Sequence, residues 1–244
     1  MVKRQTALKI RKTHRYLGLF LGIQFLMWTI SGLYYSRTDI HEIHGDQFLK
    51  VKVEEASFSG LISPSQLVLN SDINNLELID IAGKPFYWIN KTSLFNATSG
   101  EKKDGISKEE AIEVANRYVL EDLKVLDVQK ITNTNEHHEY RGRPLPAYMI
   151  SYDSSENIKA YVSEETGRFE AIRHRDWRLF DFLWMTHTMD YEGRDNFNTI
   201  ILRAFSLLGL ITVLSGFLLW YTSSPSIRKI FNKNKKSKKN EKAS

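Results

Sequence analysis

The chain has 244 residues, of which 42% are hydrophobic and 26% charged, so its composition is that of a folded protein of one or two domains rather than a disordered chain. It contains no cysteine, which excludes a disulfide scaffold, a thiolate metal site, covalently attached c-type haem and a cysteine nucleophile. The formal net charge of +5 is concentrated at the two ends, because residues 1–15 carry +6 and residues 222–244 carry +7, which leaves −8 for the remainder.

The first long apolar segment is the run from Tyr16 to Ser36, which has 21 residues and no charge. About 20 apolar residues cross a hydrocarbon layer as a helix. The run ends in the aromatic pair Tyr34 and Tyr35, which is typical of a membrane interface, rather than in a small-residue cleavage site. We therefore predict an uncleaved transmembrane helix over 16–36 instead of a signal peptide.

Three histidines flank this span. His14 stands at its inner end, where an imidazole can ligate haem iron or pair with a headgroup phosphate, and Gly18 and Gly22 follow on the same helical face, as in helices that approach one another closely. His41 and His44 follow the span three residues apart, so one helical turn places both on one side. That arrangement suits a metal or a haem edge, although a merely polar pair in a juxtamembrane segment is the simpler explanation.

The next segment, residues 37–105, shows a series of short elements. It predicts a short helix and three strands: Pro64–Leu69, Leu76–Ile81, Pro85–Ile89 and Ser93–Asn96. Residues 106–174 show a clearer series, in which Ser107 and Glu110 form a capping pattern before a helix over Glu109–Tyr118. The strands predicted after this helix are Val125–Ile131, Ala147–Tyr152, Ile158–Val162 and Phe169–Ile172.

The two series end in similar turns around Gly100 and Gly167. A helix with a small antiparallel sheet cannot bury its sheet face alone, so we predict a duplicated unit whose copies pack together or onto membrane-proximal elements. Two unrelated hairpins with a common turn chemistry are the alternative. The fold class expected for the whole chain is α+β.

Residues 175–193 predict an amphipathic helix at the membrane surface, because Trp177, Phe180, Trp184 and His187 recur at helical spacing. A neutral imidazole on such an aromatic face suits axial ligation of haem iron. An interfacial anchor whose histidine hydrogen-bonds Asp190 or Glu192 explains the pattern equally well. The arginines that are candidates to bind haem propionates are Arg173, Arg175, Arg178, Arg194 and Arg203.

A second transmembrane helix is predicted over 194–221, with its uncharged part from Ala204 to Tyr221. The glycines of the two spans that indicate helix packing, besides Gly18 and Gly22, are Gly32, Gly209 and Gly216. Because basic residues next to a span are retained in the cytoplasm, both tails, 1–15 and 222–244, are expected inside and residues 37–198 outside the cytoplasmic membrane of a bacterium. The Lys-rich tail is expected to contact anionic lipid headgroups rather than nucleic acid.

The segment GISKEEAIEVANRY with its strands and VSEETGRFEAI, over 106–172, resembles a PepSY domain, and the two apolar runs with WMTHTMDYEGRDNFN between them resemble the PepSY-associated transmembrane family. The resemblance covers nearly the whole chain except the tails. Members are typically described as iron-regulated membrane proteins, and some are implicated in haem binding and ferric-siderophore reduction. Many have four spans, so the two spans here put an intact multi-haem path within one subunit in doubt.

The resemblance and the histidines together favour a membrane protein that binds haem b and takes part in iron or siderophore uptake, with haem-dependent ferric-siderophore reduction as its reaction class and no catalytic residue identified. The second span contains no histidine, so ligation by two histidines at the inner level needs a homodimer or another membrane subunit. The alternative is a membrane-tethered binding or regulatory module that acts on an envelope protease or another partner without redox chemistry. The expected partners are the lipid bilayer and an iron–siderophore complex.

Overall fold

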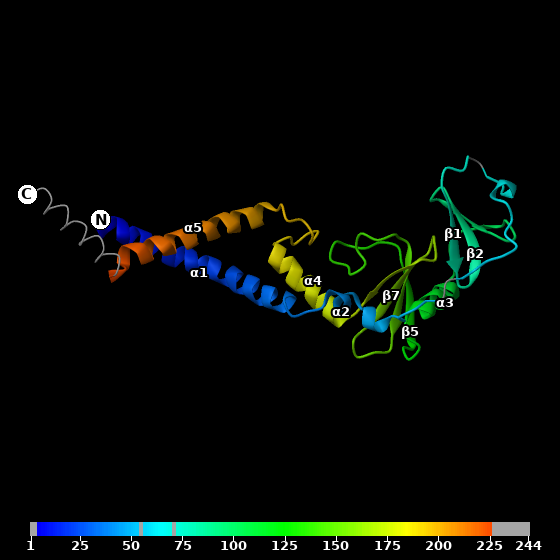
Figure 1. Ribbon diagram of the computed structural model, residues 1–244, viewed down its shortest axis with the longest axis horizontal. Coiled ribbons are helices and arrows are strands. Elements are labelled where there is room, and N and C mark those ends of the chain that lie inside the picture. The colour runs from blue at the N-terminus through cyan, green and yellow to red at the C-terminus, as the bar shows by residue number, and fades with distance from the viewer. Residues whose placement is uncertain (1–3, 54–55, 70–71, 226–244) are drawn as a thin grey trace, which may run out of the picture. The chain divides into compact units, whose positions relative to one another are not determined.

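The computed structural model describes residues 4–53, 56–69 and 72–225 (Figure 1). The chain divides into two compact units. One is the segment Arg37–Phe182, and the other combines the residues before and after it. Most of the Lys-rich tail over 222–244 lies outside the described residues, as do Met1, Val2 and Lys3 of the basic N-terminal tail.

The unit built from the chain ends contains two long helices, α1 (Arg4–Tyr35) and α5 (Ile200–Ser223), which lie side by side and antiparallel (Figure 1). Segments Leu8–Tyr35 and Ile200–Tyr221 are long and apolar enough to cross a membrane, and only 11% of each apolar window is buried. An apolar surface left so bare is what a helix presents to lipid. The first predicted span, 16–36, coincides with α1 up to Tyr35, and α1 begins earlier because Arg4–Arg15 is rich in good helix formers.

Covered positions recur every seven residues on both helices. Examples are His14, Leu21, Trp28 and Tyr35 on α1, and Leu202, Gly209 and Gly216 on α5, beside further covered positions such as Ser31 and Thr212. This period is that of helices packed at a shallow left-handed crossing angle. Gly209 contributes by its small size, because a Cβ built there would lie 3.2 Å from the Phe25 ring. Gly209 therefore leaves room on α5 for the Phe25 ring of α1.

The unit Arg37–Phe182 contains two four-stranded antiparallel sheets, each with its strands in sequence order. The first consists of β1 (Leu76–Ile81), β2 (Lys84–Ile89), β3 (Ser93–Asn96) and β4 (Lys102–Lys103). The second consists of β5 (Val125–Ile131), β6 (Ala147–Tyr152), β7 (Lys159–Ser163) and β8 (Phe169–Arg173). The predicted α+β class is thereby confirmed. The predicted helix over Pro64–Leu69 is only a 3-10 turn, η2 (Pro64–Gln66).

One hydrophobic core joins both sheets to helix α3 (Lys108–Tyr118). Its buried side chains include Ile81 and Trp88 from the first sheet, Ile150 and Val162 from the second, and Val114 from α3. The capping box predicted at the start of α3 is present. The two series of elements thus pack together, as expected for units that cannot bury a sheet face alone.

A glycine turn permits this packing. Gly167, between β7 and β8, has a φ of +65°, and a Cβ at this position would lie 2.9 Å from Ile81 of β1. Only glycine combines this backbone conformation with so close an approach. Three short helices complete the described chain: α2 (Ile40–His44), η1 (Asp46–Phe48) and α4 (Arg175–Thr188), of which the residues from Leu183 onward belong to the unit of the long helices.

Candidate functional site

His187, near the end of α4, contacts α1 through three side chains. Its Nδ1 lies 2.7 Å from the Ser31 hydroxyl, and its backbone carbonyl accepts a hydrogen bond from the Trp28 indole at 2.8 Å. The Tyr35 ring lies 5.7 Å from the imidazole, edge to face. Asp190, expected as an alternative partner, instead accepts a hydrogen bond from the Asn196 backbone N–H. His187 is therefore fixed to the first long helix.

The hydrogen bonds of Ser31 determine the tautomer of His187. The Ser31 hydroxyl lies 2.7 Å from the carbonyl oxygen of Met27, which can only accept. Since serine has one hydroxyl proton, that proton is donated to Met27, and the His187 Nδ1 must donate to the Ser31 oxygen. The lone pair of the neutral ring is then on Nε2. Burial lowers the pKa of His187, which keeps the ring neutral at physiological pH.

His14 has the same arrangement near the other end of α1. Its Nδ1 lies 2.8 Å from the Ser215 hydroxyl and 3.2 Å from the Thr212 carbonyl oxygen, and the Ser215 hydroxyl donates to that carbonyl at 2.7 Å. The carbonyl can only accept, so Nδ1 carries a proton. Among the described residues, neither His14 nor His187 has a hydrogen-bond partner at Nε2. Both rings therefore offer one uncommitted nitrogen.

The His14 ring fits against α5 because Gly216 has no side chain. A Cβ built at Gly216 would lie 3.2 Å from the His14 Cε1 atom, closer than most real Cβ contacts. Ser31, the partner of His187, is 17 residues after His14 on the same helix, a distance of about 25 Å along the helix axis. The two imidazoles thus belong to two levels of one helix pair rather than to one site.

The other candidate histidines, His41 and His44, are exposed and belong to the unit Arg37–Phe182. They lie three residues apart on α2, as the spacing indicated. His41 Nδ1 donates to the Asp46 carboxylate at 2.9 Å, and this hydrogen bond raises the pKa of His41. The structure does not bring His41 and His44 together with a further ligand-type side chain among the described residues.

The candidate propionate-binding arginines fall into two groups. Arg194 and the exposed Arg203 belong to the unit that holds both His14 and His187, and Arg203 donates to the Asn198 side chain at 3.3 Å. The remaining three are engaged within the other unit. Arg173 donates to the carbonyls of Glu139 and Ile172, Arg175 pairs with Glu156, and Arg178 pairs with the carboxylate of Glu139.

The five candidate packing glycines also fall into two groups. Gly209 and Gly216 meet side chains of α1, whereas Cβ atoms built at Gly18, Gly22 and Gly32 would have no described atom within 4 Å. The latter three leave open space on α1.

Sequence reasoning missed Gln24 and Trp28, which also donate from α1 to α4, to the backbone carbonyls of Thr186 and His187. The sequence pattern that could have identified them is a seven-residue spacing, which relates Gln24 to Ser31 and Trp28 to Leu21 and Tyr35. It also missed His174, which is buried in the other unit.

Comparison with protein families decides the affiliation. The family model described as the PepSY-associated TM region matches residues 11–242. The chain belongs to this family. The match includes His14 and His187 as well as both sheets. With its two apolar, largely bare helices, this member of the PepSY-associated TM region family is an integral membrane protein. Comparisons with curated proteins and with solved structures found no match.

Proposed function

We propose that this PepSY-associated TM region protein binds haem b at His14 and at His187, and that it serves iron uptake by reducing a ferric siderophore outside the cytoplasmic membrane. The observation that carries the proposal is the matched pair of imidazoles, each with Nδ1 committed to a serine and Nε2 uncommitted. Bound haem supplies an iron atom that exchanges one electron at a time.

The side chains around each imidazole fit a residue that would hold haem iron. Such a residue supplies a neutral imidazole whose other nitrogen donates a hydrogen bond, because this bond orients the ring and raises its basicity. Ser215 accepts that bond from His14, and Ser31 accepts it from His187. The absence of cysteine from the sequence agrees with a haem that is not covalently attached. Arg203 and Arg194 are the cationic side chains proposed to hold propionates.

A second copy of the chain is proposed to complete each level. One macrocycle cannot bridge a separation of about 25 Å between the two histidines, and α5 contains no histidine. Two chains would supply a pair of His14 side chains at one level and a pair of His187 side chains at the other. The open face of α1 at Gly18 and Gly22 supports this homodimer, since a second helix can approach there without a clash.

The charge distribution supports an orientation with both termini in the cytoplasm. The ends of α1 and α5 that carry the tails lie together, as shown by the hydrogen bond from Arg11 to Ser223. The tails carry +6 and +7, whereas the intervening chain is acidic, so the tails are retained inside. His14 then lies at the inner level and His187 at the outer level, and electrons supplied inside reach an acceptor outside.

The test is the reduced-minus-oxidised absorption spectrum of the protein purified in detergent from haem-supplied cells. We expect b-type bands that correspond to about one haem per chain. The haem content should fall by half in His14→Ala and in His187→Ala and should be lost entirely in the double variant, because each level needs its own ligand. Ser31→Ala is expected to weaken haem binding at the outer level about 10-fold, since it removes only the orienting bond.

The control is His137→Ala, which removes an exposed imidazole of a loop and is expected to leave the bands unchanged. Absence of haem bands in the wild-type protein, or equal bands in the double variant, would contradict the proposal. A tethered binding module would then be the remaining interpretation of the fold.

The homodimer has a separate test. Gly22→Leu is expected to shift the detergent-solubilised protein from dimer to monomer, measured by size-exclusion chromatography with light scattering, because a large side chain blocks close helix approach. The packing of α1 on α5 within one chain should persist, since no described atom lies within 4 Å of a Cβ at Gly22. Ile23→Phe, one residue further along the exposed surface, is the matched control and should remain dimeric.

A further inference from the structure

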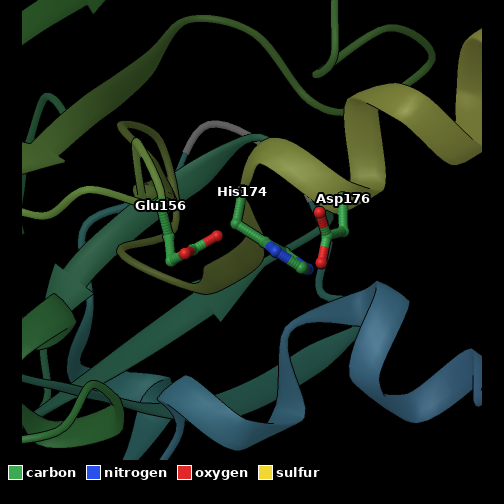
Figure 2. A group of neighbouring side chains, drawn as sticks. All are labelled: Glu156, His174 and Asp176. Carbon is green, nitrogen blue, oxygen red and sulfur yellow. The ribbon is translucent and has the colours of Figure 1, made fainter.

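A second cluster of ligand-type side chains lies in the unit Arg37–Phe182. It consists of Glu156 in the loop between β6 and β7, His174 directly after β8, and Asp176 in the first turn of α4. One ligand atom from each of the three side chains lies within 4.8 Å of the other two. Figure 2 shows the imidazole between the two carboxylates. His174 and Asp176 are two residues apart in the sequence, and the fold brings Glu156 to them.

His174 is held rigidly and carries one unused nitrogen. The residue is 1% exposed, and its Nε2 lies 3.0 Å from the carbonyl oxygens of both Glu42 and Ile43. Carbonyls only accept, so Nε2 carries the proton and Nδ1 carries the lone pair of the neutral ring. Nδ1 is buried and has no hydrogen-bond partner among the described residues. A buried polar atom without a partner costs free energy unless something binds it.

The two carboxylates of the cluster are acceptors, and the unpartnered Nδ1 of His174 is an acceptor as well. Two carboxylates and an imidazole lone pair require a positive charge, and the guanidinium of Arg175 supplies one to the carboxylates alone. Its Nη2 lies 3.2 Å from Glu156 and its Nε lies 3.7 Å from Asp176. The Arg175 side chain is 65% exposed and can turn into solvent. The cluster is therefore neutralised by a group that a stronger cation can displace.

We propose that Glu156, His174 and Asp176 form a binding site for a divalent first-row metal ion, with water completing the coordination. One imidazole nitrogen with two carboxylate oxygens suits Zn²⁺, Fe²⁺ or Mn²⁺, whereas Ca²⁺ and Mg²⁺ favour oxygen ligands only. Ligand atoms on one Zn²⁺ ion lie roughly 3.4 Å apart, so the half-buried carboxylate of Glu156 and the exposed carboxylate of Asp176 close on the ion while the buried imidazole stays fixed. The ion ties the loop before β7 to the start of α4.

This inference goes beyond the proposed haem function and does not depend on it. The experiment is isothermal titration of Zn²⁺ into the full chain in detergent after removal of metal by a chelator. We expect one site that Glu156→Gln and Asp176→Asn each weaken at least about 10-fold, because each removes a charged ligand. Arg175→Ala is expected to tighten binding several-fold, since it removes the competing guanidinium. A gain in Zn²⁺ affinity in Arg175→Ala distinguishes a metal site from a cluster held together by ion pairs alone.

Two controls define the outcome. Glu165→Gln removes an exposed carboxylate in the turn at the opposite end of the β7–β8 hairpin and should leave binding unchanged. The titrations are repeated in the His14→Ala/His187→Ala background, so that Zn²⁺ binding to the proposed haem ligands does not contribute. Zn²⁺ affinity that is the same in the Glu156→Gln/Asp176→Asn double variant as in the parent would overturn the proposal, whatever the haem spectrum shows.

Discussion

Glu139→Gln is expected to lower the unfolding free energy of the unit Arg37–Phe182 by about 3 kcal/mol, the loss typical of a buried ion pair from which one charge is removed. The Glu139 side chain is 11% exposed, and its carboxylate accepts hydrogen bonds at 2.6 Å from both Arg178 and Tyr161. The ammonium group of Lys159 forms a further ion pair with the same carboxylate, at 3.5 Å. The substitution leaves the guanidinium of Arg178 without its counter-charge.

The same carboxylate gives a pH dependence with a definite sign. Burial alone raises the pKa of Glu139, but the hydrogen bonds from Arg178 and Tyr161 and the charges of Arg178 and Lys159 outweigh it and hold the pKa below its usual value. A carboxylate whose pKa is lower in the folded state stabilises the fold above its unfolded-state pKa. This contribution is therefore lost as the pH falls from the usual pKa of a glutamate through the lower folded-state value.

The measurement is a urea titration of the full chain, with the folded fraction of the unit Arg37–Phe182 quantified by pulse proteolysis at each urea concentration. It is carried out at neutral pH and at acidic pH. The wild-type protein should lose stability on acidification more than Glu139→Gln does, because the variant has no carboxylate to protonate. Glu136→Gln, which alters an exposed carboxylate, is the control. A Glu139→Gln variant as stable as the control would show that the ion pair contributes little.

Gly216→Leu is expected to force α5 away from α1 and to remove the His14-dependent part of the haem spectrum. The Cβ alone would lie 3.2 Å from the His14 ring, and overpacking of this kind costs about 1–3 kcal/mol. The imidazole then loses the Ser215 hydrogen bond that orients its Nε2. Haem content should fall by half, with the His187-dependent part retained.

Two comparison variants make this expectation specific. Gly209→Leu crowds the Phe25 ring instead, so it should destabilise the helix pair without displacing the imidazole. Val213→Leu adds bulk to the exposed side of α5 and should change neither property. Haem content is measured by the pyridine haemochrome spectrum, and resistance of the helix pair to unfolding by titration with a denaturing detergent. A wild-type haem content in Gly216→Leu would contradict the role proposed for His14.

The elements that could be predicted from the sequence are those in which residues of one kind recur along the chain. A lipid-exposed helix needs an unbroken apolar run, and strands such as β5 and β6 are short runs of strand-forming residues bounded by turn residues, so their bounds follow from the pattern. Strand β4 has two residues, which is too few for an alternation to show. At Pro64–Gln66 the proline favours helix initiation, but the segment ends after one 3-10 turn.

The partners of the candidate ligands could not be predicted in the same way. His187 was a candidate from its own aromatic face, but Ser31, which determines its tautomer, lies 156 residues earlier. His174 was missed because it stands between two arginines in a polar segment, and only the fold brings Glu156 and the carbonyls of α2 to it. Sequence patterns report neighbours along one element, whereas these contacts join elements that are distant in the chain.

The polar contacts between the helices have a mechanical consequence. His14 bonds to α5, while Gln24 and Trp28 bond to the end of α4, and each contact occupies its own depth along α1. A sliding motion of α1 by one helical turn would break all three bonds at once in surroundings without water to replace them. The register of these helices is thus fixed, and the separation of His14 from His187 is set by the 17 residues of α1 from His14 to Ser31, the partner of His187.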